Sequence, residues 1–184
     1  MTFNLITNRL ELLPLDLHQL RMQIRDPQSL AVSLGLSLQP TLIVDPELQP
    51  ALEQMVLSVE ACPQDWHWNT NWLIISLTEK AVIGGCCFHG PPNPAGLVEV
   101  GYGLDPAFRG NGCMTEALES LIAWAFSQPH IVAVIAETIK TNLPSQRVLG
   151  RLGMRVASET GTSQWWRLDR CSFPIGKESN DGSA

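Results

Sequence analysis

The pattern of hydrophobic and polar positions in the first part of the chain predicts one strand and two helices around a broken stretch. Residues 10–15 (LELLPL) form a short apolar run typical of a strand, and Asp16 stands where it can cap the helix that follows. Four prolines and a glycine interrupt residues 27–50, so turns and short pieces are expected there. Helical spacing returns over residues 51–60, before a loop at residues 62–71 (CPQDWHWNTN).

From residue 72 onward the pattern changes to apolar, β-branched runs separated by two helices. WLIISLT and AVIGGCCFH are joined by two residues, as in a hairpin. There follow a strand at 97–104 (LVEVGYGL), a helix at 112–127, a buried strand at 131–139, a helix at 142–152 and a closing hairpin (MRVAS and QWWRLD). This order predicts one mixed α/β sheet in a single domain over residues 1–175, with a small polar tail at 176–184 that is expected to be disordered.

The charge balance argues against polyanionic partners. The 184 residues include 12 Lys+Arg against 18 Asp+Glu, a formal net charge of -6, without a cluster of basic residues. Nucleic acids and anionic membranes attract basic surfaces. We therefore expect no nucleic acid and no membrane partner, although a small anionic ligand needs only a local site.

Cysteine usage and the start of the sequence favour a cytoplasmic protein. The five cysteines include no Cys-x-x-Cys pair, which argues against a disulfide framework and against a zinc site. The first residues lack the basic segment and apolar core of a signal peptide, and no apolar run reaches the length of a membrane span. We expect reduced thiols and no metal.

The segment FRGNG at residues 108–112 predicts an anion site. Gly110 and Gly112 permit backbone conformations that a Cβ resists, and Arg109 adds a positive charge. The helix that follows presents unpaired N–H groups and a partial positive charge, which together suit a diphosphate. Neither the Walker nor the Rossmann glycine pattern occurs here. On its own, the glycine pair also fits an ordinary strand-to-helix turn.

The strand before this turn has two unequal faces. One is apolar and carries Val98, Val100, Tyr102 and Leu104, which places Tyr102 in the core. The other carries Leu97, Glu99, Gly101 and Gly103. Glycine inside a strand often marks close approach by another backbone or a ligand. We infer an open side beside the Glu99 carboxylate, leading into the anion turn.

Residues 97–118 resemble the cofactor-binding core of the GNAT N-acetyltransferase superfamily. The pyrophosphate loop of that superfamily, Arg/Gln-x-x-Gly-x-Gly/Ala, falls on Arg109, Gly112 and Met114. Residues 142–154 (NLPSQRVLGRLGM) and 7–20 (TNRLELLPLDLHQL) resemble segments of the branch that includes ribosomal-protein alanine acetyltransferases. The resemblance implies a GNAT fold, with a mixed, mostly antiparallel central sheet that is splayed at the cofactor site and flanked by helices.

The resemblance also implies acetyl-CoA as co-substrate. The residues expected to bind it are Gly103, Leu104, Arg109, Gly110, Asn111, Gly112, Cys113, Met114 and Asn142. The N–H groups of the first two would hold the thioester carbonyl. Met114 departs from the pattern, which has a small residue at this position. Its side chain either turns into the helix packing and leaves its N–H available, or crowds the diphosphate.

Transfer of an acetyl group to an amine needs a base more than an acid. An amine with a pKa of about 10 is only ~0.1% deprotonated at pH 7, a penalty of roughly 4 kcal/mol. Glu99 is the expected base, directly or through water, and Glu137 is a secondary candidate. Ser145 matches the position that this branch gives its serine, and it is the expected hydroxyl near the leaving thiol. The structural alternatives are that Glu99 is only an exposed carboxylate on a strand, and that Ser145 belongs to an ordinary first helical turn capped by Asn142. The four histidines are given no role.

These observations favour an N-acetyltransferase acting on a primary amine, which belongs to a protein N-terminus or to a small molecule. The alternatives are a catalytically silent acyl-CoA-binding module, which Met114 favours, and an unrelated α/β phosphate-binding enzyme. Whether the chain forms a homodimer is left open by the sequence.

Overall fold

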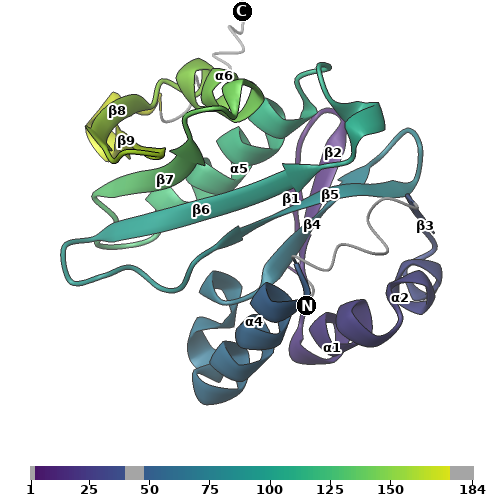
Figure 1. Cartoon of the computed structure of the whole chain (residues 1–184). Helices are drawn as coiled ribbons and strands as arrows, with labels where there is room; N and C mark the ends of the chain where they lie inside the picture. The colour runs from purple at the N-terminus through teal and green to yellow at the C-terminus, as the bar shows by residue number, and fades with distance from the viewer. Residues whose placement is uncertain (1–2, 40–47, 175–184) are drawn as a thin grey trace, which may run out of the picture.

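The centre of the molecule is a mixed β-sheet. The computed structural model describes residues 3–39 and 48–174, and their strands follow the order β1-β2-β4-β5-β6-β7-β9-β8, with β3 beside β5 (Figure 1). The strands are β1 (Leu5–Ile6), β2 (Leu10–Pro14), β3 (Ser37–Leu38), β4 (Asn71–Ser76), β5 (Ala81–Phe88), β6 (Leu97–Leu104), β7 (Ala133–Ile139), β8 (Arg155–Glu159) and β9 (Ser163–Asp169). Only β3–β5 and β6–β7 pair in parallel. The expected mixed, mostly antiparallel sheet is therefore confirmed.

Helices cover both faces of the sheet (Figure 1). One face packs against α1 (Leu17–Arg25), α2 (Pro27–Ser33) and α4 (Gln49–Ala61), and the other against α5 (Cys113–Ser127) and α6 (Leu143–Arg151). Short 3-10 turns lie at η1 (Pro63–Trp68), η2 (Pro106–Phe108) and η3 (Arg170–Ser172). Among the described residues, no helix is long and apolar enough to cross a membrane.

The helix starts follow the local sequence. Asp16 caps α1 and accepts a hydrogen bond from Gln19 N at 2.8 Å, while the Gln19 side chain bonds back to Asp16 N. The short pieces expected between residues 27 and 50 are α2 and β3. Pro27 begins α2 instead of breaking a helix, because a proline in the first turn loses no internal hydrogen bond. Residues 40–47 and the tail at 176–184 lie outside the described residues.

The sheet opens between β6 and β7. The two strands pair only from Leu97 to Glu99 on β6 and from Ala133 to Ile135 on β7. Beyond this point, β6 stays with β5 as far as Leu104, and β7 stays with β9. The expected splay is confirmed, and Figure 1 shows the strands diverging. One edge of residues 101–104 is thereby left without a strand partner, in the middle of the sheet.

Candidate functional site

The glycine turn joins the splayed end of β6 to α5. Gly110 and Gly112 have φ values of +83° and +79°, in the left-handed region that favours glycine. Gly112 is the N-cap of α5, which begins at Cys113. The Arg109 Nε–H donates to the Leu104 carbonyl at 2.9 Å and fixes the turn against the end of the strand. The first N–H groups of α5 and an arginine therefore lie at the opening of the sheet, as an anion site requires.

Met114 points into the core. Its exposed fraction is 7%, and it packs in the cluster that includes Leu118 and Leu121 of the same helix. Of the two orientations considered from the sequence, the inward one is found. The side chain does not occupy the space in front of the helix N-terminus, so the departure from the family pattern leaves the turn open.

Arg9 supports the turn from a distant part of the chain. Its Nη1 donates to the Asn111 carbonyl at 2.9 Å, and its Nε donates to Glu116 Oε2 at 2.7 Å. Thr7 Oγ1 donates to the other oxygen of Glu116 at 2.7 Å. Burial opposes ionisation of Glu116, but these hydrogen bonds prevail and hold its pKa below the ordinary value. No local sequence signal predicts this contact, because it depends on the packing of α5 against β2.

The open face of β6 is accessible. A Cβ built on Gly103 would have no atom within 4 Å, so this position lies at free space. Gly84 on β5 is the opposite case, because a Cβ there would lie 2.4 Å from the Gly103 carbonyl oxygen. Glycine at position 84 thus lets β5 pack closely against β6, whereas glycine at 103 leaves room for a ligand. The free space beside Gly103 can admit part of an extended acyl-CoA arm that lies along the strand.

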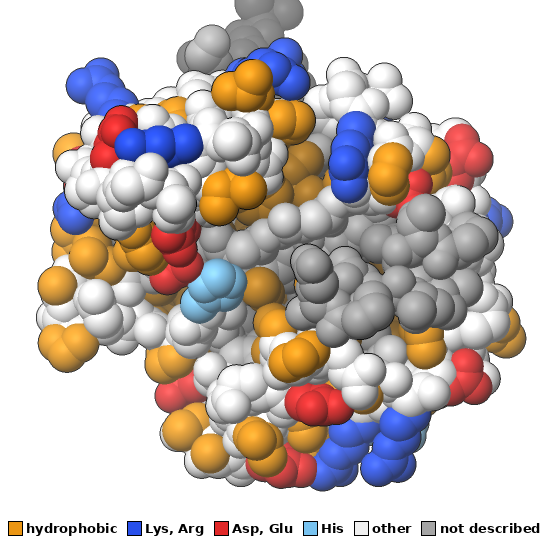
Figure 2. All heavy atoms as spheres, in the orientation of Figure 1, with side chains coloured by type: hydrophobic (Ala, Val, Ile, Leu, Met, Phe, Trp, Pro, Cys, Tyr) orange, Lys and Arg blue, Asp and Glu red, His pale blue; other side chains and the backbone are white. Residues whose placement is uncertain are grey.

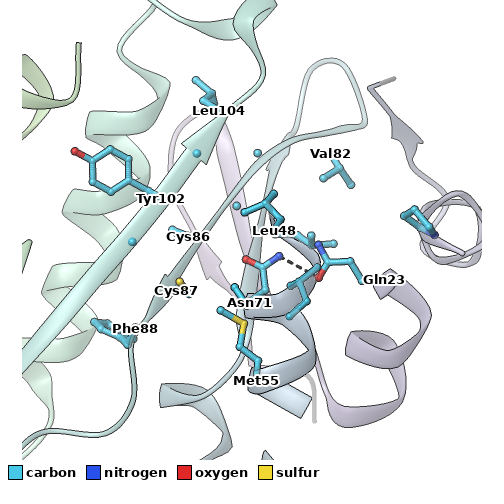
Figure 3. Close-up of a pocket in the computed structure, with 18 of the residues that line it drawn as sticks. Gln23, Leu48, Met55, Asn71, Val82, Cys86, Cys87, Phe88, Tyr102 and Leu104 are labelled. Atoms are coloured by element: carbon cyan, nitrogen blue, oxygen red, sulfur yellow. Dashed lines mark hydrogen bonds between the residues drawn. The ribbon is translucent and has the colours of Figure 1, made fainter. Parts of the chain in front are cut away.

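A pocket of about 650 Å³ lies on this side of the sheet, between β4–β6 and helices α1, α2 and α4. Leu52, Met55 and Leu73 contribute apolar surface, and Asn71 Nδ2 donates to Gln23 Oε1 at 3.1 Å across it (Figure 3). Figure 2 shows hydrophobic side chains in the hollow of this face, with Lys and Arg mostly toward its margins. Among the described lining residues, the charged ones are Asp105 and Arg109 at the turn.

Glu99 shares a hydrogen bond with His89, a residue to which the sequence pattern assigns no role. His89 Nδ1 lies 2.8 Å from Glu99 Oε1, and the side chains are 51% and 26% exposed. The two residues face each other because His89 N also donates to the Glu99 carbonyl at 2.9 Å, continuing the β5–β6 register. The pairing could have been predicted from the sequence by extending the antiparallel register of the strands at residues 81–88 and 97–104, which places His89 opposite Glu99. Glu137, on β7, is exposed, and strand alternation places it on the same face as Glu99.

Ser145 lies in the first turn of α6, on the other face of β6. Asn142 caps this helix and accepts a hydrogen bond from Ser145 N at 3.1 Å. The Tyr102 hydroxyl lies 2.5 Å from Ser145 Oγ. Tyr102 was expected in the core, and that is only half right. Its ring packs against the core, but its hydroxyl leaves the core to reach Ser145. Burial raises the pKa of Tyr102, against the effect of the Ser145 hydrogen bond.

The adjacent thiols on β5 are poorly suited to act as nucleophiles. Burial raises the pKa of Cys87 to about 11 and that of Cys86 well above its ordinary value. Thiolates, not thiols, react and bind metals, so both stay inert near neutral pH. All five cysteines are free. Trp68 packs on Phe88 and Trp124, with ring centroids 4.7 Å from each, and it does not line the pocket.

Comparisons with known proteins agree with this geometry. The family described as acetyltransferase (GNAT) domain matches residues 11–155. The uncharacterized N-acetyltransferase YjdG of Bacillus subtilis is 29% identical over 96 residues, which cover 52% of this chain and 57% of that protein, so the chain matches little more than half of this relative's length.

Two solved structures share the fold at low sequence identity. The ribosomal-protein-S5-alanine acetyltransferase from Vibrio fischeri has a TM-score of 0.64 at 16% identity, over 93% of this chain and 98% of that one. RimL, a ribosomal L7/L12 α-N-protein acetyltransferase in complex with coenzyme A, has a TM-score of 0.64 at 16% identity, over 92% of this chain and 99% of that one.

Proposed function

Because the chain belongs to the GNAT acetyltransferase family, we propose that it transfers the acetyl group of acetyl-CoA directly to a primary amine. The observation that carries this proposal is the opening of β6 from β7, with the glycine turn at one end and polar side chains on both faces. A linear thioester can lie in such an opening, with its phosphates at the helix N-terminus. The unpaired edge of the strand offers N–H and C=O groups to the amides of the cofactor arm.

The residues that would hold acetyl-CoA fall into three groups. The strand end contributes Gly103 and Leu104, whose N–H groups are candidates for the thioester oxygen. The turn contributes residues 109–114, with the inward Met114 leaving its N–H for a phosphate. Asn142 at the start of α6 is the third, beside its capping role. When bound, acetyl-CoA supplies an acetyl group activated as a thioester.

Polar groups on opposite faces of β6 suit the two proton transfers of the reaction. Glu99 and its histidine partner lie on the pocket side, where an amine would enter. Tyr102 and Ser145 lie on the other side, where their hydroxyl pair would return a proton to the leaving sulfur. A thiolate leaves readily, so this second transfer matters less than removal of the amine proton.

The pocket favours an amine carried by a mostly neutral, partly apolar molecule. Its described walls are largely apolar, and the Gln23–Asn71 amide pair offers hydrogen bonds to a neutral polar group. Glu99 and Glu137 on the open face would attract the ammonium form of the acceptor. The two structural neighbours are named as acetyltransferases of ribosomal proteins, one of them an α-N-protein acetyltransferase, so a peptide amine and a small amine are both to be tested.

The silent acyl-CoA-binding alternative loses its main support, because the Met114 side chain does not block the turn. A free-thiol release assay separates the two functions. Acetyl-CoA is incubated with the protein and with a panel of short peptides with free N-termini, alkyl and aryl amines, and polyamines. We expect thiol release with a neutral or apolar member of the panel and weaker release with polyamines. Calorimetric binding of acetyl-CoA without thiol release from any member would support the silent module, and absence of binding would contradict both functions.

A further inference from the structure

We infer that His89 Nε2 is the catalytic base that takes the proton from the acceptor amine, and that Glu99 is a positioning residue that orients the imidazole. This inference rests on the proposed function and changes the role expected for Glu99. It is carried by the placement of the two side chains relative to the open stretch of β6.

The hydrogen bond between the two side chains decides which ring nitrogen is free. His89 Nδ1 lies 2.8 Å from Glu99 Oε1. A carboxylate accepts hydrogen bonds, so Nδ1 carries the hydrogen in this contact and Nε2 of the neutral ring keeps its lone pair. A carboxylate or carbonyl that fixes the tautomer of a histidine in this way is a common arrangement around reactive imidazoles.

The free nitrogen lies over the open strand. A Cβ built on Gly101 would be 2.6 Å from His89 Nε2, so the ring occupies the space that a side chain at position 101 would fill. His89 and Gly101 both line the pocket. Nε2 therefore lies directly above Gly101, on the face of β6 that lines the pocket.

The spacing along β6 fits an amine between this nitrogen and the acetyl carbon. A strand rises about 3.3 Å per residue, so Gly103 lies about 6.6 Å beyond Gly101. An amine nitrogen in this gap can be about 3 Å from the base and about 3–3.5 Å from a carbonyl carbon held near residue 103. Glu99 starts two residues further back, and one of its oxygens is occupied by the imidazole. A base acting from Glu99 alone would need a bridging water.

His89, the Tyr102–Ser145 hydroxyl pair and solvent together account for every proton that moves in the transfer. His89 Nε2 accepts a proton from the neutral amine as the amine nitrogen bonds to the acetyl carbon. The carbon–sulfur bond breaks, and its electron pair stays on sulfur. The Tyr102–Ser145 hydroxyl pair gives a proton to the sulfur and recovers one from solvent. The imidazolium of His89, which is half exposed, then returns its proton to solvent.

Nitrogen NMR of the imidazole tests this arrangement without any substrate. In ¹⁵N-labelled protein, the His89 signals are assigned by their loss in His89→Gln, and two-bond couplings report which nitrogen carries hydrogen. We expect the neutral ring to carry its hydrogen on Nδ1 in the wild type, and to become a mixture of tautomers in Glu99→Ala. A hydrogen mainly on Nε2 in the wild type would overturn the inference, even if acetyl transfer is fully established.

Kinetics test the same inference with the amine from the panel that is acetylated fastest. We expect His89→Gln to lower kcat/KM about 10²- to 10³-fold, with the Kd for acetyl-CoA within about threefold of the wild type. The double variant His89→Gln/Glu99→Gln should lose little more than His89→Gln, because Glu99 acts through the histidine. His18→Gln, an exposed histidine on α1, is the matched control and should keep wild-type turnover. Wild-type turnover in His89→Gln together with a large loss in Glu99→Gln would overturn the inference and return the base to Glu99.

Discussion

At the scale of single residues, the chemistry proposed for β6 depends on two side-chain contacts: His89 with Glu99 on one face and Tyr102 with Ser145 on the other. Neither pair is close in sequence. In each pair, one residue (His89 or Tyr102) stands at a position where the sequence pattern alone indicates no function. Histidine at the end of an apolar strand and tyrosine on an apolar face are both common core features. The roles proposed for their polar atoms depend on the partner that the fold brings to each side chain.

Removing the hydroxyl pair tests its part in the transfer. Ser145→Ala and Tyr102→Phe are each expected to lower kcat by about tenfold or less, because a thiolate with an ordinary pKa needs little help to leave. The Kd for acetyl-CoA should stay near that of the wild type. Ser158→Ala, an exposed serine on β8, is the matched control. Turnover unchanged in both variants would show that the pair only ties β6 to α6.

Met114→Ala separates packing from cofactor binding. The side chain is buried in the α5 core, so we expect a loss of about 2–5 kcal/mol in the free energy of unfolding, measured by urea denaturation. Leu118→Ala, on the same buried face, should cost a similar amount. The affinity for acetyl-CoA, measured by calorimetry on folded protein, should change by less than about threefold. A gain of tenfold or more would mean that Met114 crowds the phosphates after all.

At the scale of elements, the close packing of β5 on β6 and the free space beside β6 depend on glycines with opposite requirements. Gly84→Ala brings a Cβ to 2.4 Å from the Gly103 carbonyl oxygen, so the strands must shift, and we expect a lower unfolding midpoint. Gly103→Ala adds a methyl group to open space and should leave the midpoint nearly unchanged while weakening acetyl-CoA binding. Urea denaturation and calorimetry on both variants provide the comparison. Equal stability of the two would contradict the strand packing described.

The start of α5 should make the stability of the protein depend on pH. The pKa of Glu116 is lowered in the fold, so its stabilising effect is complete above the ordinary value of 4.5 and is lost as pH falls through the folded pKa. We expect the wild type to have a higher urea midpoint than Glu116→Gln at pH 7, and the difference to shrink below pH 4.5. Glu119→Gln, an exposed neighbour, is the control. A difference that does not change with pH would argue against the Arg9 and Thr7 contacts as its source.

Much of the element order could be predicted from the sequence, because apolar spacing and capping residues are local signals. The hairpin β4–β5, the strand at residues 97–104 and the helices after Gly112 and Asn142 are found where their patterns place them. The direction of Met114 could not be predicted, since residues at the start of a helix can point to either side. Contacts such as Arg9 with Asn111 depend on which elements the sheet places side by side, and local spacing carries no information about that.

At the scale of the whole molecule, the sheet separates the two halves of the proposed reaction. The pocket proposed for the amine lies against α1, α2 and α4, while the hydroxyl pair lies toward α5 and α6, and β6 and β7 separate between the two sides (Figure 1). Such an arrangement would let one strand meet a thioester at its edge and an amine on its face, as the proposed function requires.

The most direct test of this account is the stoichiometry of acetyl transfer. The wild-type protein is incubated with acetyl-CoA and the amine panel, and the acetylated amine and free CoA are both quantified by mass spectrometry. We predict that one member of the panel gains an acetyl group in amounts equal to the CoA released, and only when the protein is present. Bound acetyl-CoA that stays intact with every amine, or CoA released without any acetylated amine, would contradict the account.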